Sequence, residues 1–359
     1  MVYKPEGVRP ISKPRVVDAS RPRLRIEVES SEAAELLFSL ATLFGDNRPE
    51  TFDLGADRIA ELRSSVDPEL ARLAELPVGA ACSASLLGLV YETPAPRGVA
   101  DFVAHLEAID PFEIQLNLLG YHMRGHHIAE PETIRSAALG EREAIDELIA
   151  AANRWEEKGA LVRRLLDLGA DALRAQLLEL ITRWNDEVLA PTLGEIGPLL
   201  ERSAEETRAL AATLPPNDFI VRVTGGIQYT APPEIHAVVF FPSWWFRPWV
   251  MMTEHKNLRF FNYAAADTPN DGVDDGDLAR LYKALGDEKR LALLRLLRRG
   301  PIALGQAARE VGLAKSTTHH HLAILRHAGL VLIREDDEKS YSLRDDRTID
   351  VDQLLERAR

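Results

Sequence analysis

The segment from residue 304 to residue 344 constrains the fold of this chain more than any other part of it. Leu304–Val311 has the spacing of a short helix, Gly312 follows it, and a second helix is predicted over Ser316–His327. Serine favours the first position of a helix, and glycine permits a sharp turn between helices. Two helices joined by a turn of three or four residues that contains glycine form a helix-turn-helix.

Two β-rich runs follow the second helix. Leu330–Arg334 and Ser340–Arg344 bracket a polar loop, which predicts a β-hairpin. Before the motif, Leu278–Arg299 reads as two helices broken near Gly286. These elements together predict a winged helix-turn-helix domain over residues 277–347, with a further C-terminal helix over 348–359.

The C-terminal part of the chain resembles the ArsR-type winged helix-turn-helix regulators. The resemblance lies in ALGDEKRLALLRLL (284–297), in LGQAAREVGLAKSTTHHHLAILRHAGLV (304–331) and in the hairpin after them. It implies a homodimeric repressor that binds double-stranded DNA. In that family the second helix of the motif enters the major groove, and an effector releases the protein from its operator.

The candidate DNA-binding residues lie on the second helix and at the base of the hairpin. The start of such a helix reaches base edges, whereas basic side chains contact phosphates and position the protein. The hairpin tip, Glu335–Lys339, has four acids and one base, so contacts of the wing are expected from its base instead. The residues in base or groove contact are predicted to be Ser316, Thr317, His319 and His320, and those near phosphates Lys315, Arg326, Arg334, Lys339 and Arg344.

The three consecutive histidines at 319–321 do not predict a metal site. Successive residues on a helix diverge by about 100°, so these imidazoles cannot converge on one ion. The metal-sensing branch of the resembled family uses a cysteine pair on the first helix of the motif, or Asp/His pairs on a C-terminal helix. Residues 304–310 contain no cysteine and residues 350–359 no histidine. No metal and no other cofactor is therefore expected.

The rest of the chain predicts a helical α+β body with a small sheet. Residues 1–23 are expected to form a flexible tail, 24–265 the N-terminal domain and 266–276 an acidic linker. A strand is predicted over 24–29, and helices follow from there to about Leu214. Further strands are predicted over 219–223, 235–241, 250–252 and 258–263, in a sheet covered on one face by helices.

The aromatic run FFPSWWFRPWV (240–250) allows two interpretations. Aromatic side chains beside a sheet can line an apolar pocket for a small-molecule effector, with the indole N–H groups and a guanidinium as polar handles. The pocket residues would be Trp244, Trp245, Phe246, Arg247 and Trp249. The same side chains could instead form a packing plug, a dimer contact or an interdomain contact.

Composition limits the function classes. Hydrophobic residues make up 46% of the 359 residues, enough for a large core, and no apolar run is long enough to span a membrane. One cysteine, Cys82, excludes an intrachain disulfide framework, and the N-terminus lacks the apolar run of a secretory signal, so a cytoplasmic protein is expected. The net charge is −13, yet the 277–347 segment has a small basic excess, which suits a module that approaches a polyanion.

These patterns favour a DNA-binding transcriptional regulator over two alternatives. The N-terminal domain would sense an effector, mediate dimerisation, or both. A protein-interaction scaffold that uses the winged helix as a docking module is the alternative, suggested by the acidic wing tip and the overall negative charge. No GxSxG, P-loop, GxGxxG or HExxH pattern occurs, so an enzyme is not expected.

Overall fold

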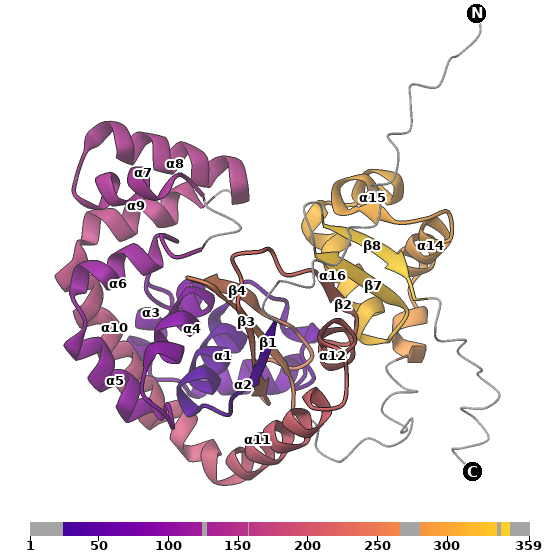
Figure 1. Cartoon of the computed structure of the whole chain (residues 1–359), viewed down its shortest axis with the longest axis horizontal. Coiled ribbons are helices and arrows are strands. Elements are labelled where there is room, and N and C mark those ends of the chain that lie inside the picture. The colour runs from indigo at the N-terminus through magenta and orange to yellow at the C-terminus, as the bar shows by residue number, and fades with distance from the viewer. Residues whose placement is uncertain (1–23, 124–127, 157, 266–280, 336–338, 345–359) are drawn as a thin grey trace, which may run out of the picture.

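A computed structural model describes residues 24–123, 128–156, 158–265, 281–335 and 339–344 of the chain. An N-terminal body of helices around a sheet lies beside a small winged helix-turn-helix at the C-terminal end (Figure 1). The predicted tail, acidic linker and C-terminal helix fall largely or wholly outside the described residues. The α+β class and the C-terminal winged helix expected from the sequence are confirmed.

The sheet of the body has four strands in the order β1-β3-β5-β4. The parallel strands are β1 (Arg25–Val28), β3 (Ala237–Ser243) and β5 (Leu258–Ala264). The edge strand β4 (Met252–His255) runs antiparallel to β5. The first strand of the chain therefore pairs with a segment about two hundred residues later. The sheet thus joins the start and the end of the sequence of the N-terminal body.

Helices cover both faces of this sheet, whereas the sequence predicted one covered face. On one side α1 (Glu32–Phe44), begun by its N-cap Ser31, packs on the sheet together with α4 (Ser83–Glu92). On the other side lie α11 (Ala190–Ala211) and α12 (Pro216–Val223). All seven residues of β3 are consequently buried, which explains why this strand is apolar throughout rather than alternating.

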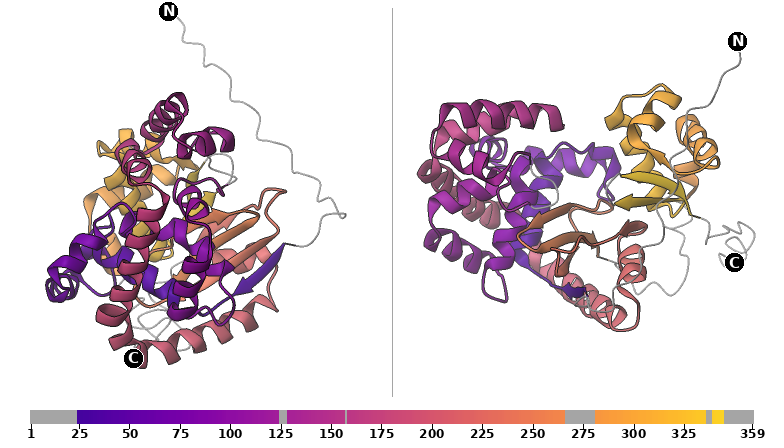
Figure 2. Two further views of the ribbon diagram at one scale, coloured as in Figure 1. Left: turned by 90° about the vertical axis from the view of Figure 1, so that its left-hand side faces the viewer. Right: turned by 45° about the horizontal axis from the view of Figure 1, so that its top comes forward.

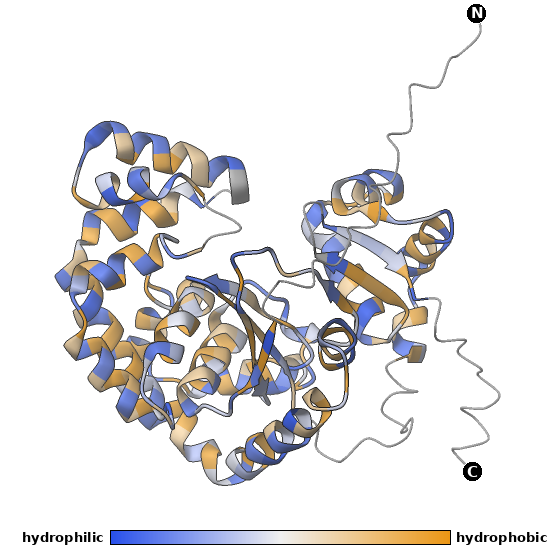
Figure 3. Ribbon diagram, viewed as in Figure 1, coloured by the Kyte–Doolittle hydropathy of each residue, from blue (hydrophilic) through white to orange (hydrophobic). Residues whose placement is uncertain are grey.

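The remaining helices form an arc around the side of the body that carries α1 (Figures 1 and 2). Many of them have one apolar and one polar side, as Figure 3 shows. In chain order they are η1 (Pro49–Thr51), α2 (Ala56–Ser65), α3 (Pro68–Ala74), η2 (Ala80–Cys82), α5 (Val99–Ala108), α6 (Pro111–Leu118), α7 (Pro131–Ala138), α8 (Arg142–Glu156), α9 (Gly159–Leu168), α10 (Ala170–Trp184) and the π turn η3 (Asn185–Leu189).

The strand predicted over 219–223 is wrong, because these residues belong to helix α12. Pro216 stands in its first turn, where the fixed φ of proline suits a helix and its missing N–H costs nothing. Phe219 and Ile220 are fully buried against the sheet, where Phe219 packs edge-on against Phe240 at 5.1 Å. A five-residue apolar run cannot distinguish a strand from the buried side of a short helix.

The winged helix consists of α14 (Glu288–Leu297), α15 (Leu304–Val311), α16 (Lys315–His327) and a four-stranded sheet. Its hairpin strands are β7 (Val331–Glu335) and β8 (Ser340–Leu343), and β6 (Ile302–Ala303) pairs with β8. The fourth strand, β2 (Ile227–Tyr229), comes from the N-terminal body and runs parallel to β7. The body and the winged helix therefore share a sheet.

Candidate nucleic-acid interface

The helix-turn-helix forms as the sequence predicted. Gly312 adopts a left-handed conformation with φ of 66° directly after α15, and α16 begins three residues later. Ala314, not Ser316, occupies the N-cap of α16. Leu322 and Leu325 of α16 pack into the domain core with Val331 and Tyr341, so the opposite side of α16 faces outward from the winged helix.

That outward side of α16 lies against the N-terminal body. The Trp249 ring is 6.5 Å from that of His319 and 6.0 Å from that of His320, both at shallow angles, and 6.1 Å from that of His327. Ala323, on the same side, is 3% exposed and belongs to the main apolar cluster of the body. The predicted recognition surface is therefore covered over most of its length, while Lys315 and Ser316 at its start remain exposed.

Burial lowers the pKa of the histidines on this surface. It lowers the pKa of His319 to about 4, and the positive charges of Lys339 and Arg326 act in the same direction. The pKa of His320 is also lowered, chiefly by burial and then by its neighbour His321. The packed helix therefore presents neutral imidazoles to Trp249 at neutral pH.

Arg326, expected near phosphates, is instead buried, with 3% of its surface exposed. One guanidinium nitrogen donates to the backbone carbonyl of Thr224, and the other lies 2.9 Å from Nε2 of His327. Burial lowers its pKa to about 10, so it stays charged at neutral pH. Arg326 thus joins α16 to the segment between α12 and β2 in this arrangement.

The basic residues at the base of the hairpin have a different environment. Arg334 is exposed, and Lys339 and Arg344 are half-buried. Of the predicted wing tip, Glu335–Lys339, residues 336–338 fall outside the described residues. Because Gln228 of β2 pairs with Arg334, the body borders the hairpin along β7, which lies between β2 and β8 in the sheet.

The aromatic segment is mostly packed into the body. Glu35 of α1 accepts hydrogen bonds from the backbone N–H groups of Trp244 and Trp245, at 2.8 and 2.9 Å. Burial raises the pKa of the Glu35 carboxyl to about 7 despite these two donors. Trp245 is 1% exposed, and Arg247 donates to the carbonyl of Ala265 at 3.0 Å. These contacts fix the backbone that presents the neighbouring indole to α16.

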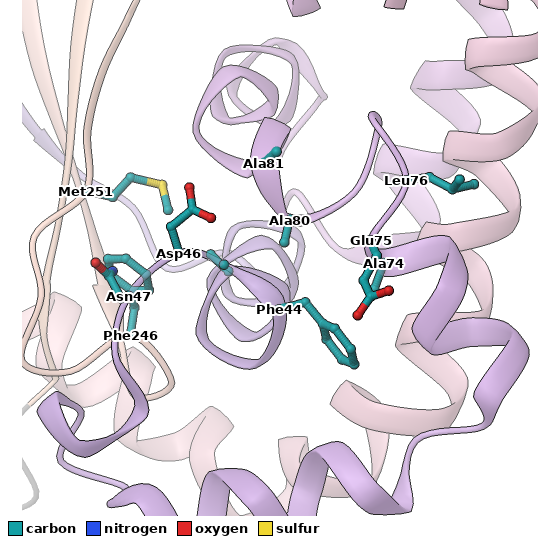
Figure 4. Close-up of a pocket in the computed structure, with 12 residues that line it drawn as sticks. Phe44, Asp46, Asn47, Ala74, Glu75, Leu76, Ala80, Ala81, Phe246 and Met251 are labelled. Carbon is teal, nitrogen blue, oxygen red and sulfur yellow. The ribbon is translucent and has the colours of Figure 1, made fainter. Parts of the chain in front are cut away.

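Trp249 itself is 7% exposed, and its indole N–H donates to Thr51 at 2.9 Å. This side chain therefore makes the interdomain contact that was one of the two interpretations of the aromatic run. Phe246, from the same run, lines a pocket of about 320 Å³ beside the end of α1. Figure 4 shows Asp46 and Met251 close to Phe246 there, with Glu75 across the helix end.

Metal-ligating side chains and membrane-spanning helices were sought among the described residues. Within the described ranges no three His, Cys, Asp or Glu side chains are grouped so that they could hold a metal ion. None of the helices in the same ranges is long and apolar enough to cross a membrane.

Comparison with known proteins identifies the winged helix. Residues 287–332 match the family described as bacterial regulatory protein, arsR family. An uncharacterized HTH-type transcriptional regulator of Bacillus subtilis (strain 168) is 38% identical over 76 residues, which are 20% of this chain and 76% of that protein. Another, from Methanocaldococcus jannaschii, is 34% identical over 80 residues, 22% of this chain and 90% of that protein.

The chain belongs to the arsR family of bacterial regulatory proteins. No solved structure matches it significantly. The matches to these relatives lie in the winged helix and support a DNA-binding regulator. The N-terminal body lies outside the matches. The body nevertheless contributes β2 to the sheet of this arsR-family module and Trp249 to its recognition helix.

Local sequence patterns do not indicate these interdomain residues. Thr224 and β2 lie in a short segment between prolines, and three residues are too few for a periodic pattern. Arg222, in a segment predicted as a strand, and Arg298, in a predicted helix, line a groove with Arg334 and Arg344, and no local pattern indicates that these side chains come together. The alternation within β7 and β8 is a signal that could have placed Arg334 and Arg344 on one face.

Proposed function

We propose that this arsR-family protein is a homodimeric repressor that binds operator DNA through α16 and that its N-terminal body controls access to that helix. The family supports the DNA-binding role. The exposed Lys315 and Ser316, with Thr317, His319 and His320 behind them, are the proposed contacts in the major groove. Neutral imidazoles and hydroxyl groups suit base edges, and Lys315 suits a phosphate.

The contact between Trp249 and α16 is the observation that carries the control step. The major groove of B-DNA is about 12 Å wide and admits a bare helix. It cannot also admit an indole, or the body attached to it, on the side of the helix that faces the bases. Full insertion of α16 therefore requires its separation from Trp249.

Charge supports the same conclusion. The whole chain carries a net charge of −13, and the module that meets DNA is its mildly basic part. The acidic excess lies in the rest of the chain, so a body held beside α16 brings net negative charge towards the phosphates, which opposes binding. We therefore assign the closed arrangement to a state of low DNA affinity, from which an open state with higher affinity forms.

The experiment is selection of bound fragments from random DNA by the full-length protein and by its Trp249→Ala variant, near physiological salt. The expected result is an inverted repeat with half-sites about one helical turn apart, enriched more strongly by the variant. The matched control is Trp244→Ala, because Trp244 belongs to the same segment and no ring contact with α16 is found for it among the described residues.

Failure of both proteins to enrich any sequence, with folding retained, contradicts the proposal. That result would favour a docking role for the winged helix, which the packing of α16 on a protein surface also suits. Enrichment that is equal in the two proteins would keep the DNA-binding role and remove the control by Trp249.

A further inference from the structure

The outer face of the winged-helix sheet carries arginine side chains. Val331 and Ile333 of β7 point to the helices of the domain and are buried. Successive side chains of a strand point to opposite faces, so Leu332 and Arg334 point away from those helices. Arg344 follows the neighbouring strand β8, and its backbone N–H bonds to the carbonyl of Leu330. The inner face holds α16, and the outer face holds this basic surface.

The N-terminal body turns that face into a groove of about 800 Å³. One wall is α12, with Val221 and Arg222, and the other is the sheet with the end of α14, where Arg298 lies. Four arginines thus line the groove, one from the body and three from the winged helix. Asp218 is the one carboxylate among the described residues that line the groove.

This charge distribution is unusual for the chain. The protein has 56 acidic and 43 basic residues, yet the described lining of the groove contains four guanidinium groups and one carboxylate. The guanidinium groups of the body and of the winged helix repel each other across the groove, and an anion bound between them offsets that repulsion. The planar fork of arginine matches carboxylate and phosphate groups in a two-point geometry.

We propose that this groove is an effector site for a small multivalent anion, with two or more carboxylate or phosphate groups and an apolar part. The charged groups would bind Arg222 on the body and Arg298, Arg334 or Arg344 on the winged helix. The apolar part would lie on Leu332 and Val221, which also line the groove. Pockets of this size accommodate small-molecule ligands.

The effect of the anion on DNA binding rests on the proposed function. An anion that bridges the two walls binds the closed arrangement more tightly than the open one, and a ligand shifts an equilibrium by that difference in affinity. The bound anion therefore holds α16 against Trp249 and releases the protein from DNA. Because α16 packs on the opposite face of the same sheet, a duplex in contact with α16 does not occupy the groove.

The test is calorimetric titration of the full-length protein with citrate and, separately, with pyrophosphate, at an ionic strength held constant with potassium chloride. Saturable binding of one of them to the wild type is expected, at least tenfold weaker in Arg222→Gln. The two probes distinguish a carboxylate ligand from a phosphate ligand. The matched control is Arg202→Gln, an exposed arginine of α11 outside the groove, which should bind as the wild type does.

A second measurement links the groove to DNA. The anion that binds should weaken binding of the selected operator at least tenfold in the wild type and leave Arg222→Gln unaffected. Absence of binding that depends on Arg222 overturns the anion site, whatever the outcome for DNA. Loss of DNA affinity in Arg222→Gln without any anion also overturns it, because the groove would then belong to the DNA path. Anion binding that depends on Arg222 but leaves DNA affinity unchanged upholds the site and contradicts the proposed control of α16.

Discussion

The indole of Trp249 and the imidazole of His320 lie nearly parallel, with 6.0 Å between ring centroids and 28° between their planes. One residue belongs to the N-terminal body and the other to the recognition helix. The exposure of the DNA-binding side of α16 therefore depends on the position of the Trp249 side chain. A change that moves Trp249 therefore changes the accessibility of α16.

Replacement of Trp249 by alanine should increase affinity for the selected operator by roughly tenfold. Aromatic pairs contribute about 0.5–1.5 kcal/mol each beyond simple burial, and tenfold corresponds to about 1.4 kcal/mol. Loss of the stack with His319 and His320 shifts the population towards the open state. Fluorescence anisotropy with a labelled operator measures the change. An unchanged affinity in Trp249→Ala, with Trp244→Ala also unchanged, contradicts the masking role.

Arg326→Ala should destabilise the folded protein by about 2 kcal/mol, because a charged hydrogen bond to the buried carbonyl of Thr224 is lost. Urea unfolding followed by circular dichroism measures the free energy of unfolding. Arg309→Ala, at an exposed position on α15, is the matched control and should change stability little. If Arg326 acted at phosphates alone, the two variants would unfold alike and differ in DNA affinity.

Glu35 should make the protein less stable as the pH rises. Its pKa is about 7 in the folded protein and near 4.5 when exposed. The folded state therefore binds more protons than the unfolded state between these values, and the stabilisation present at low pH is lost as the pH rises through about 7. Burial is the cause, since it disfavours the carboxylate more than the amide donors of Trp244 and Trp245 favour it.

The measurement is the free energy of unfolding of the wild type and of Glu35→Gln at pH 5 and pH 8. The difference between the two proteins should shift by on the order of 2 kcal/mol in favour of the variant across this range. Glu32→Gln, an exposed position on the same helix, is the control and should show no such shift. Parallel pH profiles for the wild type and Glu35→Gln would exclude the assignment.

The local elements of the winged helix could be predicted because each carries its own signal. Gly312 supplies the left-handed residue that ends α15, and the alternation around β7 and β8 defines the hairpin. β2 could not be predicted, since its pairing with β7 joins residues over a hundred positions apart and depends on packing rather than on a local pattern. The second covered face of the body sheet is likewise a tertiary property.

The same limit applies to the candidate interface. The sequence predicts that His319 and His320 contact the groove, and the structure shows both rings packed on Trp249. Trp249 is held from other elements by Thr51, which accepts from its indole N–H, and by Asn262, which donates to its backbone carbonyl. A basic residue on such a helix is expected at phosphates, and nothing local to α16 indicates that Arg326 is buried against the segment around Thr224.

DNA binding should strengthen on mild acidification more in the wild type than in Trp249→Ala. In the closed arrangement the pKa of His319 is about 4, because of burial and of the charges of Lys339 and Arg326. Exposed histidine has a pKa of about 6.5, so the open state gains a proton as the pH falls below that value while the closed state does not. Lower pH therefore stabilises the open state, by up to about tenfold between pH 7.5 and pH 5.5.

Protonated histidines also attract phosphates, and that gain occurs in both proteins. The diagnostic quantity is therefore the ratio of the two affinities, measured by anisotropy at each pH and constant ionic strength. The affinity of the wild type should approach that of Trp249→Ala as the pH falls to 5.5, since acid and the substitution release the same contact. His319→Gln in the wild-type background should reduce this convergence, because the group with the largest shift has been removed. A constant ratio across the pH range would show that α16 does not leave Trp249 when His319 gains its proton.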